Sequence, residues 1–169
     1  HFIIGYRFSP EEIEEPGIRF EDTMFLLNTL AEYEPDYFHI SANSYQRTSI
    51  VNQEDTEPLI NKYIKMQSAQ LAKIPLIGVG SIAQRQDAEH ALELGYDLLS
   101  VGKAYLVEPQ WTDKISQNEE VEQFVDIHDQ KVLHIPSPLW KVMDFMILDK
   151  EEEHRKYEKL KALQNKKVK

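Results

Sequence analysis

The sequence has 169 residues, of which 41% are hydrophobic and 28% are charged, with a formal net charge of -10 at pH 7. These values predict a globular chain that can bury a core, and they argue against a disordered chain or a surface that binds duplex nucleic acid. No apolar run approaches the ~20 residues that a membrane helix needs, and the sequence has no cysteine for a disulfide or a thiolate nucleophile. A cytoplasmic protein that binds neither membrane nor nucleic acid fits this composition.

The first part of the chain predicts two strands with a helix between them. Residues 2–8 and 37–41 are apolar runs of strand length. Apolar residues recur at three- and four-residue spacing from Met24 to Ala31, which predicts a helix that ends before Pro35.

A polar loop follows at residues 42–57, and it is longer than an ordinary connection. Pro58 suits the first turn of the next helix, and we expect Ile60, Ile64 and Leu71 to form the buried stripe of that helix.

The centre of the chain carries the clearest strand, helix and strand pattern. Residues 74–80 and 97–101 are short apolar runs that suit strands buried on both faces. The segment between them, residues 84–94, predicts a helix that Gly95 ends. Such a unit implies parallel strands whose carboxyl ends share one edge of a sheet. The residues that we expect on the buried side of this helix are Ala88, Ala91 and Leu92.

A further helix at residues 104–107 completes an α/β pattern of four parallel strands, each followed by a helix. Four such units fit either an open doubly wound sheet or half of an eight-stranded barrel, and periodicity does not choose between them.

We expect two domains, residues 1–118 and a mostly helical C-terminal extension at 119–169. The extension opens with acidic residues, continues with an apolar segment at 132–140 and ends in a charged helix. Its apolar ridge either packs weakly on the outside of the protein or contacts another copy; the ridge consists of Tyr157, Leu160 and Leu163.

Two glycine-ended strands point to a phosphate site. Gly80 allows close backbone approach and Ser81 adds a hydroxyl, while Gly102 repeats the turn one unit later and Lys103 adds a positive charge. Barrels bind phosphate at the loops after their last two strands. The alternative is two tight turns and a surface lysine.

Two other polar residues lie in apolar strands. Arg7 stands near the end of the first strand, where barrel enzymes place functional residues, although an ion pair with Glu11 or Glu12 would also explain it. His39 is either a hydrogen-bonded core residue or a donor that faces a ligand. We assign no catalytic residue and no metal ligand, because no acid-base pair, nucleophile or metal-ligand spacing stands out.

The order of several motifs resembles the C-terminal half of the old yellow enzymes, the NADH:flavin oxidoreductase family. The resemblance covers roughly residues 1–115. The motifs are IGYRFSP at 4–10, DYFHIS at 36–41, GVGSI at 78–82, DLLSVGK at 97–103 and EPQW at 108–111.

This resemblance implies half of an FMN-binding (β/α)8 TIM barrel that moves hydride from NADH or NADPH through the flavin to a small electron-poor acceptor. It implies that Arg7 contacts the pyrimidine side of the flavin ring and that Gly80 and Ser81 donate backbone N–H groups to its phosphate. Gly102 and Lys103 would complete the phosphate site.

Two departures from the family pattern stand out. The family usually has arginine at Lys103, and its first four strands are missing from this sequence. We therefore expect a fragment of a longer protein, inactive without an N-terminal half-barrel, or two copies that pair edge to edge. The alternatives are a flavin-independent phosphate-binding barrel enzyme and a non-catalytic scaffold domain.

Overall fold

The computed structural model describes residues 2–124, 130–131, 133–146 and 150–167. The chain divides into two compact units. The first unit comprises residues 1–82 and 86–101, and the second comprises residues 83–85 and 102–169. The predicted domain boundary after residue 118 is a different division, and it stays a prediction.

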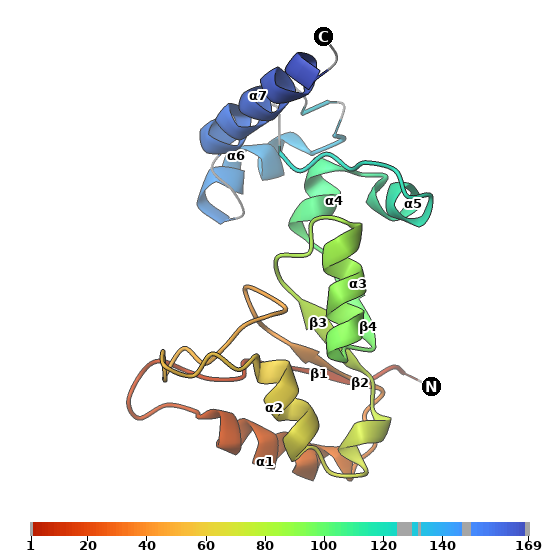
Figure 1. The fold of residues 1–169 in the computed structure, drawn as a ribbon. Helices are drawn as coiled ribbons and strands as arrows, with labels where there is room; N and C mark the ends of the chain where they lie inside the picture. Colours follow the sequence, from red (N-terminus) through yellow and green to blue (C-terminus); the bar gives the residue numbers. More distant parts are fainter. Residues whose placement is uncertain (1, 125–129, 132, 147–149, 168–169) are drawn as a thin grey trace. The chain divides into compact units, whose positions relative to one another are not determined.

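The first unit is built on a four-stranded parallel sheet, shown in Figure 1. Its strands lie in the order β1-β2-β3-β4, and every neighbouring pair is parallel. The α/β class with parallel strands is therefore confirmed. The strands are β1 (Gly5–Phe8), β2 (Tyr37–Ile40), β3 (Leu76–Val79) and β4 (Leu98–Ser100).

One face of this sheet forms the core of the first unit. Phe8, Phe38, Ile40 and Leu76 are buried on it. The helices of the unit bury their own apolar residues, among them Met24 and Leu27 of α1 and Leu59 and Ile60 of α2. The helices are α1 (Phe20–Ala31), α2 (Leu59–Met66), η1 (Leu71–Lys73) and α3 (Arg85–Leu94).

The other face of the sheet is open. Side chains alternate between faces along a strand, so residues in register on parallel strands share a face. Arg7, His39, Ile77 and Leu98 form one such row across the sheet. Arg7 and Leu98 are exposed, and His39 and Ile77 are half-buried. Parallel sheets are normally covered on both faces, so this face lacks its usual cover in the described residues.

Strand β1 is shorter than the predicted run at residues 2–8. It begins at Gly5, and Phe2, Ile3 and Ile4 are exposed. Its neighbour in the sheet, β2, begins at Tyr37, so in the part of the chain that the structure describes no strand lies beside the residues before Gly5.

The prediction of a buried position is wrong for two helix residues. Ile64 and Leu92 are 42% and 48% exposed. Leu71 is fully buried as expected, but it lies in η1, because the chain turns extended at Gln67 and ends α2. Gly95 ends α3 with a φ of 112°, as predicted.

The second unit is helical in the described residues. A small core forms where the extension packs on α4, with Val107 and Ile135 buried at its centre. The predicted apolar segment therefore packs against the chain before it, and its last residues begin helix α6. The helices are α4 (Lys103–Val107), α5 (Trp111–Ser116), α6 (Ser137–Met146) and α7 (Lys150–Lys167).

Among the contacts of the described residues, an ion pair joins the charged helix α7 to the segment that precedes α6. Lys161 Nζ lies 2.9 Å from a carboxylate oxygen of Glu122. Tyr157 and Leu160 are half-buried, and the side chain of Leu163 lies outside the described residues. None of the helices that the structure describes is both long enough and apolar enough to cross a membrane.

Candidate functional site

The turn after β3 has a conformation that favours glycine at its first position. Gly80 has a φ of 96° and Ser81 has a φ of 55°. A Cβ atom on Gly80 would lie 2.4 Å from the carbonyl carbon of Asn43. Glycine is therefore required here both by the backbone angle and by the neighbouring chain.

This turn is hydrogen-bonded to the loop after β2. The backbone N–H of Tyr45 donates to the carbonyl of Gly80 at 3.0 Å, and the Ser81 hydroxyl donates to the carbonyl of Asn43 at 3.0 Å. The Ser81 hydroxyl proton, which the sequence suggested for a ligand, is thus used within the chain. Ser81 is exposed, and its backbone N–H remains the group that the phosphate prediction needs.

Strands β3 and β4 end side by side. Val79 is paired with Ser100 in a parallel register. The sequence predicted neighbouring parallel strands ending in glycine turns, and this arrangement of the two strands is confirmed.

The second predicted turn belongs to the second unit. Gly102 has a φ of -115° and precedes α4, whose first residue is the exposed Lys103. A Cβ atom on Gly102 would meet nothing within 4 Å. The joining of this turn with Gly80 and Ser81 into one phosphate site stays a prediction.

Arg7 lies exposed on the open face of the sheet. The alternative ion pairs are not formed in the described structure. The Glu11 carboxylate instead accepts hydrogen bonds from the Ser49 hydroxyl at 3.0 Å and the Ile50 N–H at 2.9 Å. Glu12 accepts from the N–H of Ile18. The Arg7 guanidinium is therefore not neutralised by either carboxylate.

His39 lies beside Arg7 in the strand register. Its Nε2 atom is buried and has no hydrogen-bond partner among the described residues, so the first alternative for His39, a hydrogen-bonded core residue, does not hold for this atom. Burial lowers the pKa of His39, and the positive charge of Arg7 lowers it further. Both effects disfavour the protonated imidazole. The strand register places Arg7 next to His39. Their spacing in the sequence could not have predicted this.

The sequence profile of the NADH:flavin oxidoreductase / NADH oxidase family matches residues 1–122. This chain belongs to that family.

The sequence is also similar to individual named proteins. The chain is 61% identical over 164 residues to the NADH:acrylate oxidoreductase of Vibrio harveyi and 50% identical over 150 residues to the NADH:fumarate oxidoreductase of Klebsiella pneumoniae. These alignments cover 97% and 88% of this chain, but only 16% of each relative. A Bacillus subtilis protein named "Probable NADH-dependent flavin oxidoreductase YqiG" is 36% identical over 84% of this chain and 38% of its own length. The chain therefore spans well under half the length of these relatives.

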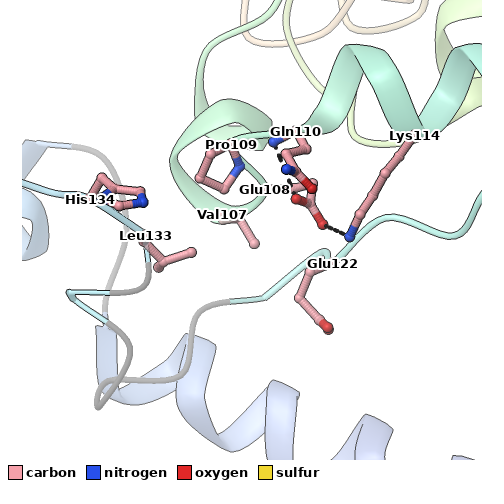
Figure 2. A pocket seen from close by; sticks show the side chains of 8 residues that line it. All are labelled: Val107, Glu108, Pro109, Gln110, Lys114, Glu122, Leu133 and His134. Atoms are coloured by element: carbon pink, nitrogen blue, oxygen red, sulfur yellow. Dashed lines mark hydrogen bonds and ion pairs between the residues drawn. The ribbon is translucent and has the colours of Figure 1, made fainter.

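Glu122, the last residue that the family profile matches, lines a hollow in the second unit, shown in Figure 2. It has a volume of about 450 Å³, with apolar walls from Val107, Pro109 and Leu133. Burial alone would raise the pKa of Glu108, but hydrogen bonds from Lys114 and from backbone N–H groups lower it more. The ion pair of Glu108 with Lys114 is drawn in Figure 2. The hollow therefore contains a paired, ionised carboxylate, which suits a structural role.

No metal site accompanies these features. Among the residues that the structure describes, no group of three or more histidine, aspartate or glutamate side chains could hold a metal ion.

Proposed function

We propose that this chain supplies the flavin-phosphate end of an FMN-dependent NADH oxidoreductase. The observation that carries the proposal is the turn after β3, held in an unusual conformation beside β4 in a chain of the NADH:flavin oxidoreductase family. Family membership favours this function over a flavin-independent barrel enzyme or a scaffold domain.

The residues present fit the phosphate of FMN. Gly80 and Ser81 would donate backbone N–H groups to phosphate oxygens, and Lys103 would add a positive charge. Gly102 has space for a close ligand, because a Cβ atom there would meet no atom within 4 Å. Lysine lacks the forked guanidinium of the usual family arginine, so Lys103 would hold the phosphate as a point charge.

Arg7 fits the ring end of the flavin. Its guanidinium is exposed on the open sheet face and forms no ion pair with Glu11 or Glu12. Placed at the pyrimidine side of the ring, this charge would stabilise the negative charge that the reduced ring carries. Bound FMN would supply the hydride chemistry between a nicotinamide and an electron-poor acceptor.

The open face of the sheet supports the finer proposal that the four strands are half of a (β/α)8 barrel. Four strands leave two edges unpaired and the inner face of a barrel uncovered. We propose that a further half-barrel in the same polypeptide covers this face, or that a second copy of the chain does. The low coverage of the relatives favours the first arrangement.

The relatives' names extend the proposal to reductant and acceptor. Two of them are named for NADH together with acrylate or fumarate. For the whole polypeptide we therefore propose NADH as the reductant and a small α,β-unsaturated carboxylate as the final acceptor.

The test uses the longer polypeptide that carries this sequence. We expect the purified protein to contain bound FMN, seen as flavin absorption, and to oxidise NADH. Arg7→Ala should lower kcat for NADH oxidation about 100-fold by loss of a charge that faces the reduced ring, whereas Arg19→Ala, in a loop of the same unit, should not. Absence of flavin and of NADH oxidation in the unchanged polypeptide would refute the proposal.

A further inference from the structure

The loop after β2 packs directly on the Gly80–Ser81 turn. Two hydrogen bonds join them, from the N–H of Tyr45 to the Gly80 carbonyl and from the Ser81 hydroxyl to the Asn43 carbonyl, both at 3.0 Å. The contact is tight, because a Cβ atom on Gly80 would lie 2.5 Å from the backbone nitrogen of Ser44. The conformation of the turn is therefore coupled to the position of residues 43–45.

Tyr96 fixes this loop. Its hydroxyl donates to the carbonyl of Tyr45 at 3.0 Å, and the residue is only 4% exposed. Its ring lies on β3, since a Cβ atom on Gly78 would come within 2.6 Å of the ring. Burial raises the pKa of Tyr96 to about 12, so its hydroxyl remains a donor at every physiological pH.

The side chain of Tyr45 fixes the loop on the other side. Its hydroxyl lies 3.3 Å from Nδ1 of His90 on α3, and the two rings pack edge to face with their centroids 5.7 Å apart. Tyr45 is buried and His90 is exposed. Residues 43–45 are thus held between β3 and α3, two elements of the same unit.

Gly80 and Ser81 both have positive φ angles, and such a conformation is disfavoured for serine unless surrounding contacts impose it. Those contacts come from the group formed by Asn43, Tyr45 and Tyr96, which we call the turn brace. An anion site depends on donors that already point at the anion before it binds. The direction of the Ser81 N–H is set by this imposed conformation.

We propose that Tyr96, acting through the turn brace, is a positioning residue for the FMN phosphate. This inference rests on the proposed function. Tyr96 itself need not touch the flavin, because its hydroxyl is occupied by the Tyr45 carbonyl. Its effect on binding comes through the backbone of the Gly80–Ser81 turn.

The test compares two buried tyrosines in the flavin-free longer polypeptide. Tyr96→Phe removes the hydroxyl that holds the brace and keeps the ring. Tyr63→Phe is the matched control, because Tyr63 is also buried in the first unit but its hydroxyl has no partner among the described residues. The affinities of FMN and of riboflavin, which lacks the phosphate, are measured by quenching of flavin fluorescence.

We expect Tyr96→Phe to raise the Kd for FMN about tenfold, the loss of roughly one well-formed hydrogen bond. The Kd for riboflavin should stay within about twofold, because the brace acts on the phosphate turn alone. Tyr63→Phe should change neither value. Hydrogen exchange at the Gly80 and Ser81 amides should accelerate in Tyr96→Phe and not in Tyr63→Phe.

Other outcomes overturn the inference. An equal loss of FMN and riboflavin affinity in Tyr96→Phe would indicate a general structural role. An unchanged FMN affinity in Tyr96→Phe, with normal FMN binding by the unchanged protein, would refute the positioning role and leave the proposed function intact. If the unchanged protein binds neither flavin, the proposed function is wrong and the role toward phosphate falls with it, whatever hydrogen exchange shows about the brace.

Discussion

The two glycine turns look alike in sequence but differ in structure. Gly80 has a φ of 96°, and a Cβ atom on it would collide with the backbone of Asn43. Gly102 has a φ of -115° and a ψ of -81°, without the positive φ that favours glycine, and a Cβ atom on it would meet nothing within 4 Å. The first glycine is explained by its own fold. The second has no such explanation in the described residues, and a bound phosphate would supply one.

The difference matters for how such motifs are interpreted. A glycine that its neighbours require is explained without a ligand, so at Gly80 the phosphate proposal rests on the conformation of the turn and on family membership. A glycine with empty space beside it is a further sign of close approach by another group. Substitution of each glycine separates these two roles.

The largest effect is expected from Gly80→Ala. The added methyl group must move the Asn43 backbone or leave the positive φ, so we expect a loss of about 3 kcal/mol in the free energy of unfolding. Denaturant unfolding of the chain measures this loss. A change below about 0.5 kcal/mol would show that the turn and the brace are not tightly coupled.

Gly102→Ala is the contrasting substitution. We expect it to leave the free energy of unfolding within about 0.5 kcal/mol of the unchanged chain, since its Cβ atom has space. In the longer polypeptide it should raise the Kd for FMN about tenfold, if phosphate lies against this backbone. Equal FMN affinity in the two proteins would remove Gly102 from the site.

Lys103→Arg tests how the cation beside Gly102 contributes to phosphate binding. The guanidinium fork can bind two phosphate oxygens, so we expect FMN to bind about threefold more tightly. Lys103→Met should weaken FMN binding and leave riboflavin binding unchanged. Equal effects on both flavins would place Lys103 away from the phosphate.

The smallest effect concerns the open face of the sheet. Burial and Arg7 lower the pKa of His39 below the ordinary value of 6.5, so the unfolded chain binds this proton more readily than the folded chain. Stability should therefore fall as the pH drops below about 6.5 towards the folded pKa, and His39→Gln should flatten this dependence.

NMR titration of the His39 ring measures its pKa directly. Arg7→Ala should raise this pKa only in part, because burial is the larger cause. A folded pKa at or above 6.5 would contradict the described packing of the ring.

Sequence periodicity predicted the larger elements because the apolar residues recur at the positions that are buried in the structure. The helix from Met24 to Ala31 and the parallel strands β3 and β4 agree with it. It failed where one residue of an apolar series is not needed in the core, as at Ile64 and Leu92. It also overextended β1, whose length depends on where its neighbour begins.

The candidate site was less predictable because it depends on contacts between distant segments. Chain spacing identified the glycines but could not show that the Ser81 hydroxyl is used by Asn43. Nor could it place His39 beside Arg7, or show that Tyr96 holds the loop after β2. These features depend on strand register and loop packing, which no short motif encodes.

The most direct measurement is a crystal structure of the longer polypeptide with FMN bound. The account predicts phosphate oxygens within about 3 Å of the Ser81 backbone N–H and of Lys103 Nζ, with the Arg7 guanidinium at the pyrimidine side of the ring. A flavin phosphate bound to other residues, with the Gly80–Ser81 turn facing solvent, would contradict it.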